Sequence, residues 1–184
     1  KSITVYGATG CVGLYICQYL LAASDVNKQP IRLVLAGRNK AKLEKRMEAL
    51  EAKSGTSTME VFVADSTDLT SLTKMAKQTK VVIACAGPFQ HYGTNVVAAC
   101  ANSGTDYVDI TGEFFWAAKM RQQFGEAAKK SGARIISLCG FDSVPSDISI
   151  LAAVEALREA RGGADVEIET GTSWHRPGGA ANAG

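Results

Sequence analysis

Short apolar runs alternate along the chain with segments in which apolar residues recur every three or four positions. Nearly continuous runs of Val, Ile and Leu are typical of strands that are covered on both faces, as in a parallel sheet. We therefore predict buried strands separated by helices. The strand-like runs lie at residues 3–6, 32–36, 61–64, 81–86, 107–110, 134–138 and 166–170.

The segments between these runs have the periodicity of amphipathic helices. Asn39 can cap the second of them, and Pro145 suits the first turn of the last. In the first two helices the apolar stripes are formed by residues 12, 16 and 20 and by residues 43, 47 and 50. The remaining helices are expected around residues 69–77, 95–103, 117–131 and 145–161.

This alternation implies right-handed crossovers and an α/β fold with a doubly wound parallel sheet. The runs up to residue 138 suit the Rossmann strand order 3-2-1-4-5-6. A further run at 166–170 leads into a series of small residues without a packing signal. We expect a dinucleotide-binding domain over residues 1–148. Residues 149–184 are expected to form a linking helix and the first strand of a truncated second domain, for substrate binding or dimerisation.

Composition narrows the class of protein. The formal net charge of +2 gives no reason to expect nucleic acid as a partner. The apolar runs are far shorter than the roughly 20 residues that a membrane helix needs. Five cysteines without a CxxC motif, and two histidines, argue against a metal site and against a disulfide framework. We therefore expect a reducing compartment, the cytoplasm, although the chain starts at Lys1 and a targeting segment could have been removed.

A glycine-rich loop follows the first predicted strand and opens the first predicted helix. Such a loop places backbone N–H groups and the positive end of the helix dipole against a pyrophosphate. The first glycine allows the tight turn, the second the approach of the phosphates and the third close helix–strand packing. The expected cofactor-binding residues here are Gly7, Ala8, Thr9, Gly10, Cys11, Val12 and Gly13.

The end of the second predicted strand indicates which dinucleotide binds. NAD-specific domains have an Asp or Glu there, which binds the ribose hydroxyls. This chain instead has Arg38, which can pair with a 2′-phosphate, so NADP is expected and NAD is the alternative. A solvated Arg38 at the start of a helix is the competing interpretation. Asp65, after the third strand, is expected beside the adenine, or else in a simple turn.

Ligands of open α/β sheets bind beyond the carboxyl ends of the strands. After the fourth strand this rule selects Ala86, Gly87, Pro88 and Phe89, of which Gly87 allows close approach to the cofactor. His91, Asp109, Glu113 and Asp142 are the candidates for proton transfer or substrate binding. For Asp109, Glu113 and Asp142, capping of the helices that follow them is the competing role.

The strand-end motifs taken together resemble the saccharopine dehydrogenase-like oxidoreductases, including the branch of trans-acting enoyl reductases. They cover nearly the whole chain and are far more specific than the glycine loop alone. The matching segments are GATGxxG at 7–13, AGR at 36–38, AGPFxxYG at 86–93, AACxxSGTDYVDITGE at 98–113 and GFDSVPSD at 140–147.

The resemblance implies NAD(P) binding by the glycine loop and Arg38, with residues 87–89 and 140–143 near the nicotinamide. It also implies a second domain that completes the substrate site, because members of the family are considerably longer. We therefore expect residues 1–184 to bind cofactor without turning over substrate, and a homodimer to form through that second domain. Relatives often have Phe-Thr in place of Cys11-Val12, so a hydroxyl that could contact phosphate is missing.

Two functions of different kinds fit the sequence. The first is an NADP-dependent oxidoreductase that transfers hydride to or from an imine or amine, an enoyl or a carbonyl substrate. The second is a non-catalytic domain that binds NADP(H) as a sensor or scaffold. A short-chain dehydrogenase is disfavoured, because none of the five tyrosines is followed by Lys four residues later.

Overall fold

The computed structural model describes residues 2–51, 55, 57–163 and 165, and they fall into two units. The first unit spans Lys1–Cys139, and the second starts at Gly140. Within the described residues, the first unit contains a six-stranded parallel sheet of order β3-β2-β1-β4-β5-β6. The strands are β1 (Ser2–Tyr6), β2 (Arg32–Gly37), β3 (Thr58–Val63), β4 (Val81–Ala84), β5 (Asp106–Asp109) and β6 (Ile135–Ile136).

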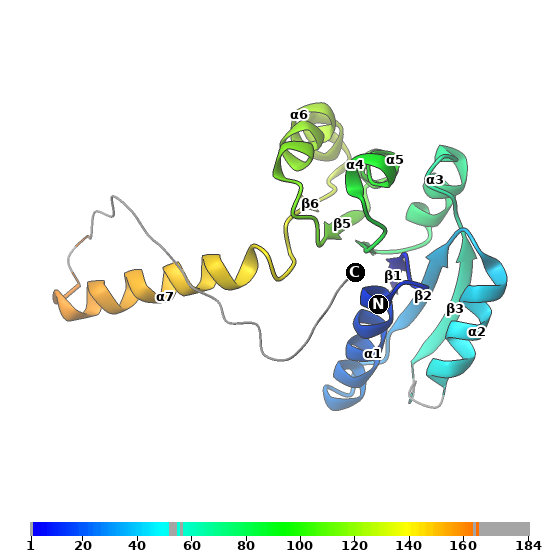
Figure 1. Ribbon diagram of the computed structural model, residues 1–184, viewed down its shortest axis with the longest axis horizontal. Helices are drawn as coiled ribbons and strands as arrows, with labels where there is room; N and C mark the ends of the chain where they lie inside the picture. Colours follow the sequence, from blue (N-terminus) through cyan, green and yellow to red (C-terminus); the bar gives the residue numbers. More distant parts are fainter. Residues whose placement is uncertain (1, 52–54, 56, 164, 166–184) are drawn as a thin grey trace. The chain divides into compact units, whose positions relative to one another are not determined.

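Helices cover both faces of this sheet (Figure 1). Helices α1 (Cys11–Val26) and α2 (Lys40–Glu51) pack on one face, around Val5, Leu33 and Leu35. The opposite face, around Val82 and Tyr107, is covered by three helices. These are α3 (Leu69–Lys77), α5 (Thr94–Ser103) and α6 (Phe114–Ser131), and the short α4 (Phe89–Tyr92) precedes α5.

The helices form where the sequence pattern and its boundary residues place them. In α1 the buried residues Gly13, Cys17, Leu21 and Ser24 recur at helical spacing, so this stripe faces the sheet. The stripe predicted at residues 12, 16 and 20 is wrong, since Val12 is 43% exposed and the other two residues are only partly buried. Asn39 caps α2, because its Oδ1 accepts a hydrogen bond of 3.0 Å from the N–H of Lys42. Glycines in the left-handed conformation end α5 and α6.

The predicted doubly wound Rossmann fold is confirmed, and the strand order is the expected one. The last strand is shorter than the run at 134–138 predicted. The backbone of Leu138 has φ 66°, which takes the chain out of the extended conformation directly after Ser137. The run predicted at 166–170 lies outside the described residues.

The second unit contains helix α7 (Val144–Ala160), with Pro145 in its first turn as predicted. The domain boundary expected at residue 148 lies inside this helix and stays a prediction. No helix in the described part of the chain is long and apolar enough to cross a membrane.

Candidate cofactor-binding site

The carboxyl ends of the six strands lie along one edge of the described sheet, as parallel pairing requires. The strand order reverses between β1 and β4, because β2 lies on one side of β1 and β4 on the other. Such a switch point is where ligands bind in open α/β sheets. The predicted cofactor residues of the first unit all follow strand ends: 7–13 after β1, 38 after β2, 65 after β3 and 86–89 after β4.

The glycine loop between β1 and α1 is fixed by close backbone approaches. Gly7 has φ +90°, and a Cβ there would lie 2.9 Å from the amide nitrogen of Ala86 in the loop after β4. A Cβ on Gly13 would lie 2.5 Å from the carbonyl oxygen of Gly7. Any side chain at either position would therefore displace backbone, so both glycines are needed for the loop to form.

Gly10 differs from these two glycines. Its φ of −74° suits any residue, and a Cβ there would have a single neighbour within 4 Å, the carbonyl oxygen of Gly7 at 3.3 Å. The surrounding protein therefore places little demand on this position. Gly10 is also the N-cap of α1 and offers no side-chain bond to the free N–H groups of the first turn. An open, uncapped helix start is suited to a phosphate.

One side chain from α2 contacts this loop. The Arg46 guanidinium donates a hydrogen bond of 3.0 Å from Nη2 to the carbonyl oxygen of Thr9. Nothing in the sequence relates Arg46 to this loop, which lies 37 residues away along the chain, so its role could not be predicted.

Arg38 and Asp65 lie after the neighbouring strands β2 and β3. Arg38 is exposed, and its guanidinium has no hydrogen-bond or ion-pair partner among the described residues. Asp65 is held in a turn, since its Oδ1 accepts bonds from Thr67 N at 2.8 Å and Thr67 Oγ1 at 2.7 Å. These bonds lower the pKa of Asp65. Burial, and then the charge of Asp65, raise the pKa of the Tyr6 phenol beneath them.

The loop after β4 is held in place by a residue that follows β5. The peptide between Gly87 and Pro88 is cis, and Phe89 turns inward to stack on Trp116 with ring centroids 5.7 Å apart. Glu113 accepts two backbone hydrogen bonds from this segment, from Phe89 N at 2.7 Å and Gln90 N at 2.8 Å. The competing role considered for Glu113, capping of α6 by its side chain, is wrong: it is the N-cap residue of α6 but makes no such bond.

The turn from β5 to α6 also contacts the end of β6. Asp109 is completely buried, and its carboxylate accepts bonds from Ser137 Oγ at 2.8 Å and from Leu138 N at 3.1 Å. Within the turn, Asp109 accepts from Thr111 N, and Thr111 Oγ1 accepts from Glu113 N at 3.0 Å. This chain of bonds links the ends of β4, β5 and β6 at the sheet edge.

The other catalytic candidates occupy different places. His91 is exposed on α4, beside the Tyr92 ring. Asp142 belongs to the second unit, and so do the remaining residues of the GFDSVPSD motif. Among the residues that the structure describes, no three His, Cys, Asp or Glu side chains are grouped as a metal site.

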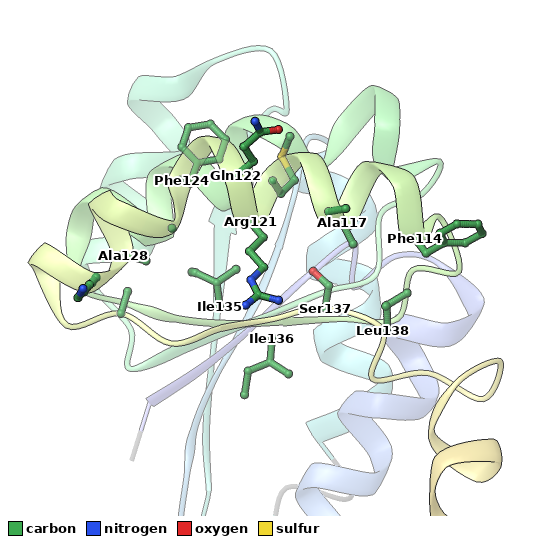
Figure 2. A pocket seen from close by; sticks show the side chains of 15 residues that line it. Phe114, Ala117, Arg121, Gln122, Phe124, Ala128, Ile135, Ile136, Ser137 and Leu138 are labelled. Carbon is green, nitrogen blue, oxygen red and sulfur yellow. The ribbon is translucent and has the colours of Figure 1, made fainter. Parts of the chain in front are cut away.

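A pocket of about 950 Å³ lies away from these loops, between α6 and β6 (Figure 2). Ile135 lines it from β6, Ser137 from the segment after β6, and Arg121 and Phe124 from α6. It contains none of the residues of the glycine loop or of the loop after β4. The pocket is therefore separate from the candidate cofactor site.

Comparison with known proteins gives a consistent assignment. The family model "saccharopine dehydrogenase NADP binding domain" matches residues 3–136. A "lipid droplet localized protein" of Caenorhabditis elegans is 39% identical over 150 residues, which are 80% of this chain and 35% of that protein. A "trans-acting enoyl reductase" of Mycobacterium ulcerans is also 39% identical over 150 residues, 80% of this chain and 34% of the relative.

The fold has a counterpart among solved structures. Saccharopine dehydrogenase (L-Glu forming) from Saccharomyces cerevisiae superposes with a TM-score of 0.64 at 22% identity, covering 88% of this chain and 32% of that one. At this identity the likeness concerns the fold. The chain thus spans about a third of the length of the curated relatives it matches.

Proposed function

The chain belongs to the family of saccharopine dehydrogenase NADP binding domains, and from this premise we propose that it forms the cofactor-binding part of an NADP-dependent oxidoreductase. The presence of Arg38 after the second strand predicts NADP as the cofactor, and the family assignment confirms NADP. The observation that carries the proposal is the combination of an uncapped, open helix start at Gly10 with an unpaired guanidinium at the end of β2.

The proposed binding mode follows the strand ends. The pyrophosphate would lie against Gly10 and the N–H groups of residues 11–13, where a side chain would occupy its space. Arg38 would bind the adenosine 2′-phosphate by a charge-assisted pair. Asp65 would lie beside the adenine, with one carboxylate oxygen already held by Thr67.

The nicotinamide half would extend across the switch point to residues 86–89. Gly7 and Ala86 are in close backbone contact, so the loop after β1 and the loop after β4 form one continuous surface. When bound, the cofactor supplies or accepts hydride. The loops of this chain orient it and fix the position of the reacting ring, which is how a protein of this kind contributes to the rate.

The substrate class is proposed from the relatives. One relative is named a trans-acting enoyl reductase, and a solved structure of the same fold is a saccharopine dehydrogenase. We propose reduction of an enoyl or imine group, with a carbonyl as the further option. His91 and Asp142 remain candidates for contact with the substrate, and a homodimer remains a proposal.

The state of the cysteine thiols supports a proposal for the cellular compartment of the protein. All five cysteines are free, which suits a reducing compartment such as the cytoplasm. A relative named for lipid droplets suggests the surface of that organelle as a specific location. Fractionation of cells that express the tagged protein would separate a free cytoplasmic pool from a droplet-bound one.

Calorimetric titration tests the proposed function directly. The chain of residues 1–184 is expected to bind NADPH more tightly than NADH and to be stabilised against heat by NADPH. A protein of the relatives' length should consume NADPH with an enoyl or imine substrate, whereas a sensor would bind without consuming it. Absence of NADPH binding would contradict the proposal.

A further inference from the structure

We propose that Glu113 is a positioning residue for the nicotinamide half of the cofactor and acts through the backbone of residues 88–90. The inference rests on the proposed function, which assigns the loop after β4 to the nicotinamide. It changes the role of Glu113 from a candidate for catalysis or substrate binding to a residue that sets the shape of the site. The two roles predict different effects of substitution.

The geometry shows how the carboxylate is used. Each of its oxygens accepts a bond from a different N–H group, that of Phe89 at 2.7 Å and that of Gln90 at 2.8 Å. Bonds of this kind to an ionised acceptor are about twice as strong as neutral ones. Both oxygens are thus engaged by the protein backbone.

The loop needs these bonds because α4 cannot satisfy its own first turn. The first N–H groups of any helix lack an intrahelical acceptor, and the N-cap of α4 is Pro88, which makes no side-chain bond. Glu113 supplies the acceptors from 24 residues away in sequence. Phe89 is held a second time by its contact with Trp116, so the loop is fixed at two points.

Glu113 is itself held in place from behind. Its N–H donates to Thr111 Oγ1, and the N–H of Thr111 donates to the buried carboxylate of Asp109. Locked supporting residues of this kind are what keeps a binding site within a small tolerance of its productive geometry. The carboxylate is therefore oriented before any ligand arrives.

The test compares two ligands that share the adenosine half, NADPH and adenosine 2′,5′-bisphosphate. Glu113→Gln preserves size but leaves one acceptor oxygen, and its amide N–H group would face a backbone N–H group. We expect the affinity of the 184-residue chain for NADPH to fall about tenfold and that for the bisphosphate to stay unchanged. The fluorescence of the reduced nicotinamide on binding should also lose its wild-type signature.

Glu126→Gln is the matched control, because Glu126 is exposed on α6 and the change in charge is the same. It should leave both affinities unchanged. If the Glu113→Gln variant does not fold, the Thr111→Val variant is used for the same two titrations. This substitution removes the acceptor for the Glu113 N–H. We expect it to lower the affinity for NADPH by about fivefold and to leave the affinity for the bisphosphate unchanged.

The outcomes separate the inference from the function on which it rests. Equal NADPH affinity of wild type and Glu113→Gln, or an equal loss for both ligands, would overturn the positioning role alone. Failure of the wild-type chain to bind NADPH would overturn the proposed function, and the inference with it. A loss confined to NADPH supports both.

Discussion

The guanidinium of Arg46 on α2 donates a hydrogen bond of 3.0 Å to the carbonyl oxygen of Thr9 in the glycine loop. The loop is thereby joined to the helix that follows β2, as well as to its own strand and helix. The peptide between Thr9 and Gly10 is thus held on both sides, because its carbonyl accepts from Arg46 and its N–H donates to the carbonyl oxygen of Gly7 at 3.0 Å.

Substitution of Arg46 is expected to weaken the binding of NADPH and of NADH to the same extent. Arg46→Ala removes a charge-assisted bond to the loop that would hold the pyrophosphate, which NADPH and NADH have in common. In calorimetric titration we expect the affinity for each dinucleotide to fall by about tenfold or less, and the ratio of the two affinities to stay unchanged. Lys45→Ala, an exposed change on the same helix, should have no effect. A loss confined to NADPH would instead indicate that Arg46 contacts the 2′-phosphate.

Substitution of Arg38 should affect one cofactor only. A charge-assisted bond contributes roughly 1.5–3 kcal/mol. Arg38→Ala should therefore lower the affinity for NADPH by about ten- to a hundredfold and the affinity for NADH much less. The guanidinium makes no hydrogen bond or ion pair among the described residues and has only an electrostatic interaction with Asp65 and Tyr6, so the melting temperature without ligand should change little. Equal losses for NADPH and NADH would show that Arg38 does not read the 2′-phosphate.

A side chain at Gly10 should block binding without unfolding the protein. Gly10 has ordinary backbone angles, and a Cβ there has one neighbour within 4 Å, the Gly7 carbonyl oxygen at 3.3 Å, so Gly10→Val should fold with a melting temperature close to that of the wild type. The branched side chain would occupy the space proposed for the pyrophosphate and abolish binding of both dinucleotides. Gly125→Val is the control, because a Cβ at Gly125 meets nothing within 4 Å. Normal NADPH binding by folded Gly10→Val would show that the phosphates lie elsewhere.

Thiol labelling offers a test that needs no change in the site. Cys11 and Cys139 are exposed, whereas burial raises the pKa of Cys17, Cys85 and Cys100 to about 12 and keeps these three thiols unreactive at neutral pH. In a Cys139→Ser variant, alkylation of the native protein should therefore occur at Cys11. Its rate should fall with added NADPH in proportion to the unliganded fraction. A rate that is indifferent to saturating NADPH would place the phosphates away from Cys11.

The pairing of β5 with β6 should respond to acid. Hydrogen bonds from the side chain and then the backbone of Arg134 lower the pKa of Asp106. A lowered folded-state pKa stabilises the protein above the unfolded value of about 3.9, and this contribution is lost as the pH falls through the folded value. Asp106→Asn should thus lower the melting temperature at pH 7, and the difference from wild type should shrink below about pH 4.

Glu48→Gln, on the exposed part of α2, provides the comparison for this titration. It removes one carboxylate without removing a hydrogen bond to the sheet. Its melting curve should follow that of the wild type across the same pH range. A difference between Asp106→Asn and wild type that does not shrink as the pH falls below about 4 would mean that the pair acts through something other than the charge of Asp106.

Local pattern was sufficient to predict most of the fold. The strand and helix positions follow from runs and stripes that neighbouring residues define, and Asn39 caps α2 as expected. The end of β6 did not follow from pattern: Leu138 looks like a strand residue, but its N–H donates to Asp109 and its φ is positive. A contact from another strand overrides the local preference there.

The site was predictable in its glycines and less so in its supporting residues. The positions after β1 and β2 are set by strand ends, which a sequence reveals. The partner of Glu113 was not predictable, because Asp, Glu, Ser and Thr before a helix are common caps of that same helix. Its carboxylate instead reaches Phe89 and Gln90, and this requires the register of β4 against β5, which no local motif encodes.

The strand order has a consequence for solubility. β3 and β6 are the two outer strands of the described sheet, and each pairs on one side. An outer strand offers free N–H and C=O groups to another chain, and long, flat, uncharged ones promote aggregation. β6 has two paired residues and is a poor template, whereas β3 has six. Glu60 in the middle of β3 is exposed, charged and paired with Arg32, and we expect such a charge to oppose edge-to-edge joining of copies of this domain.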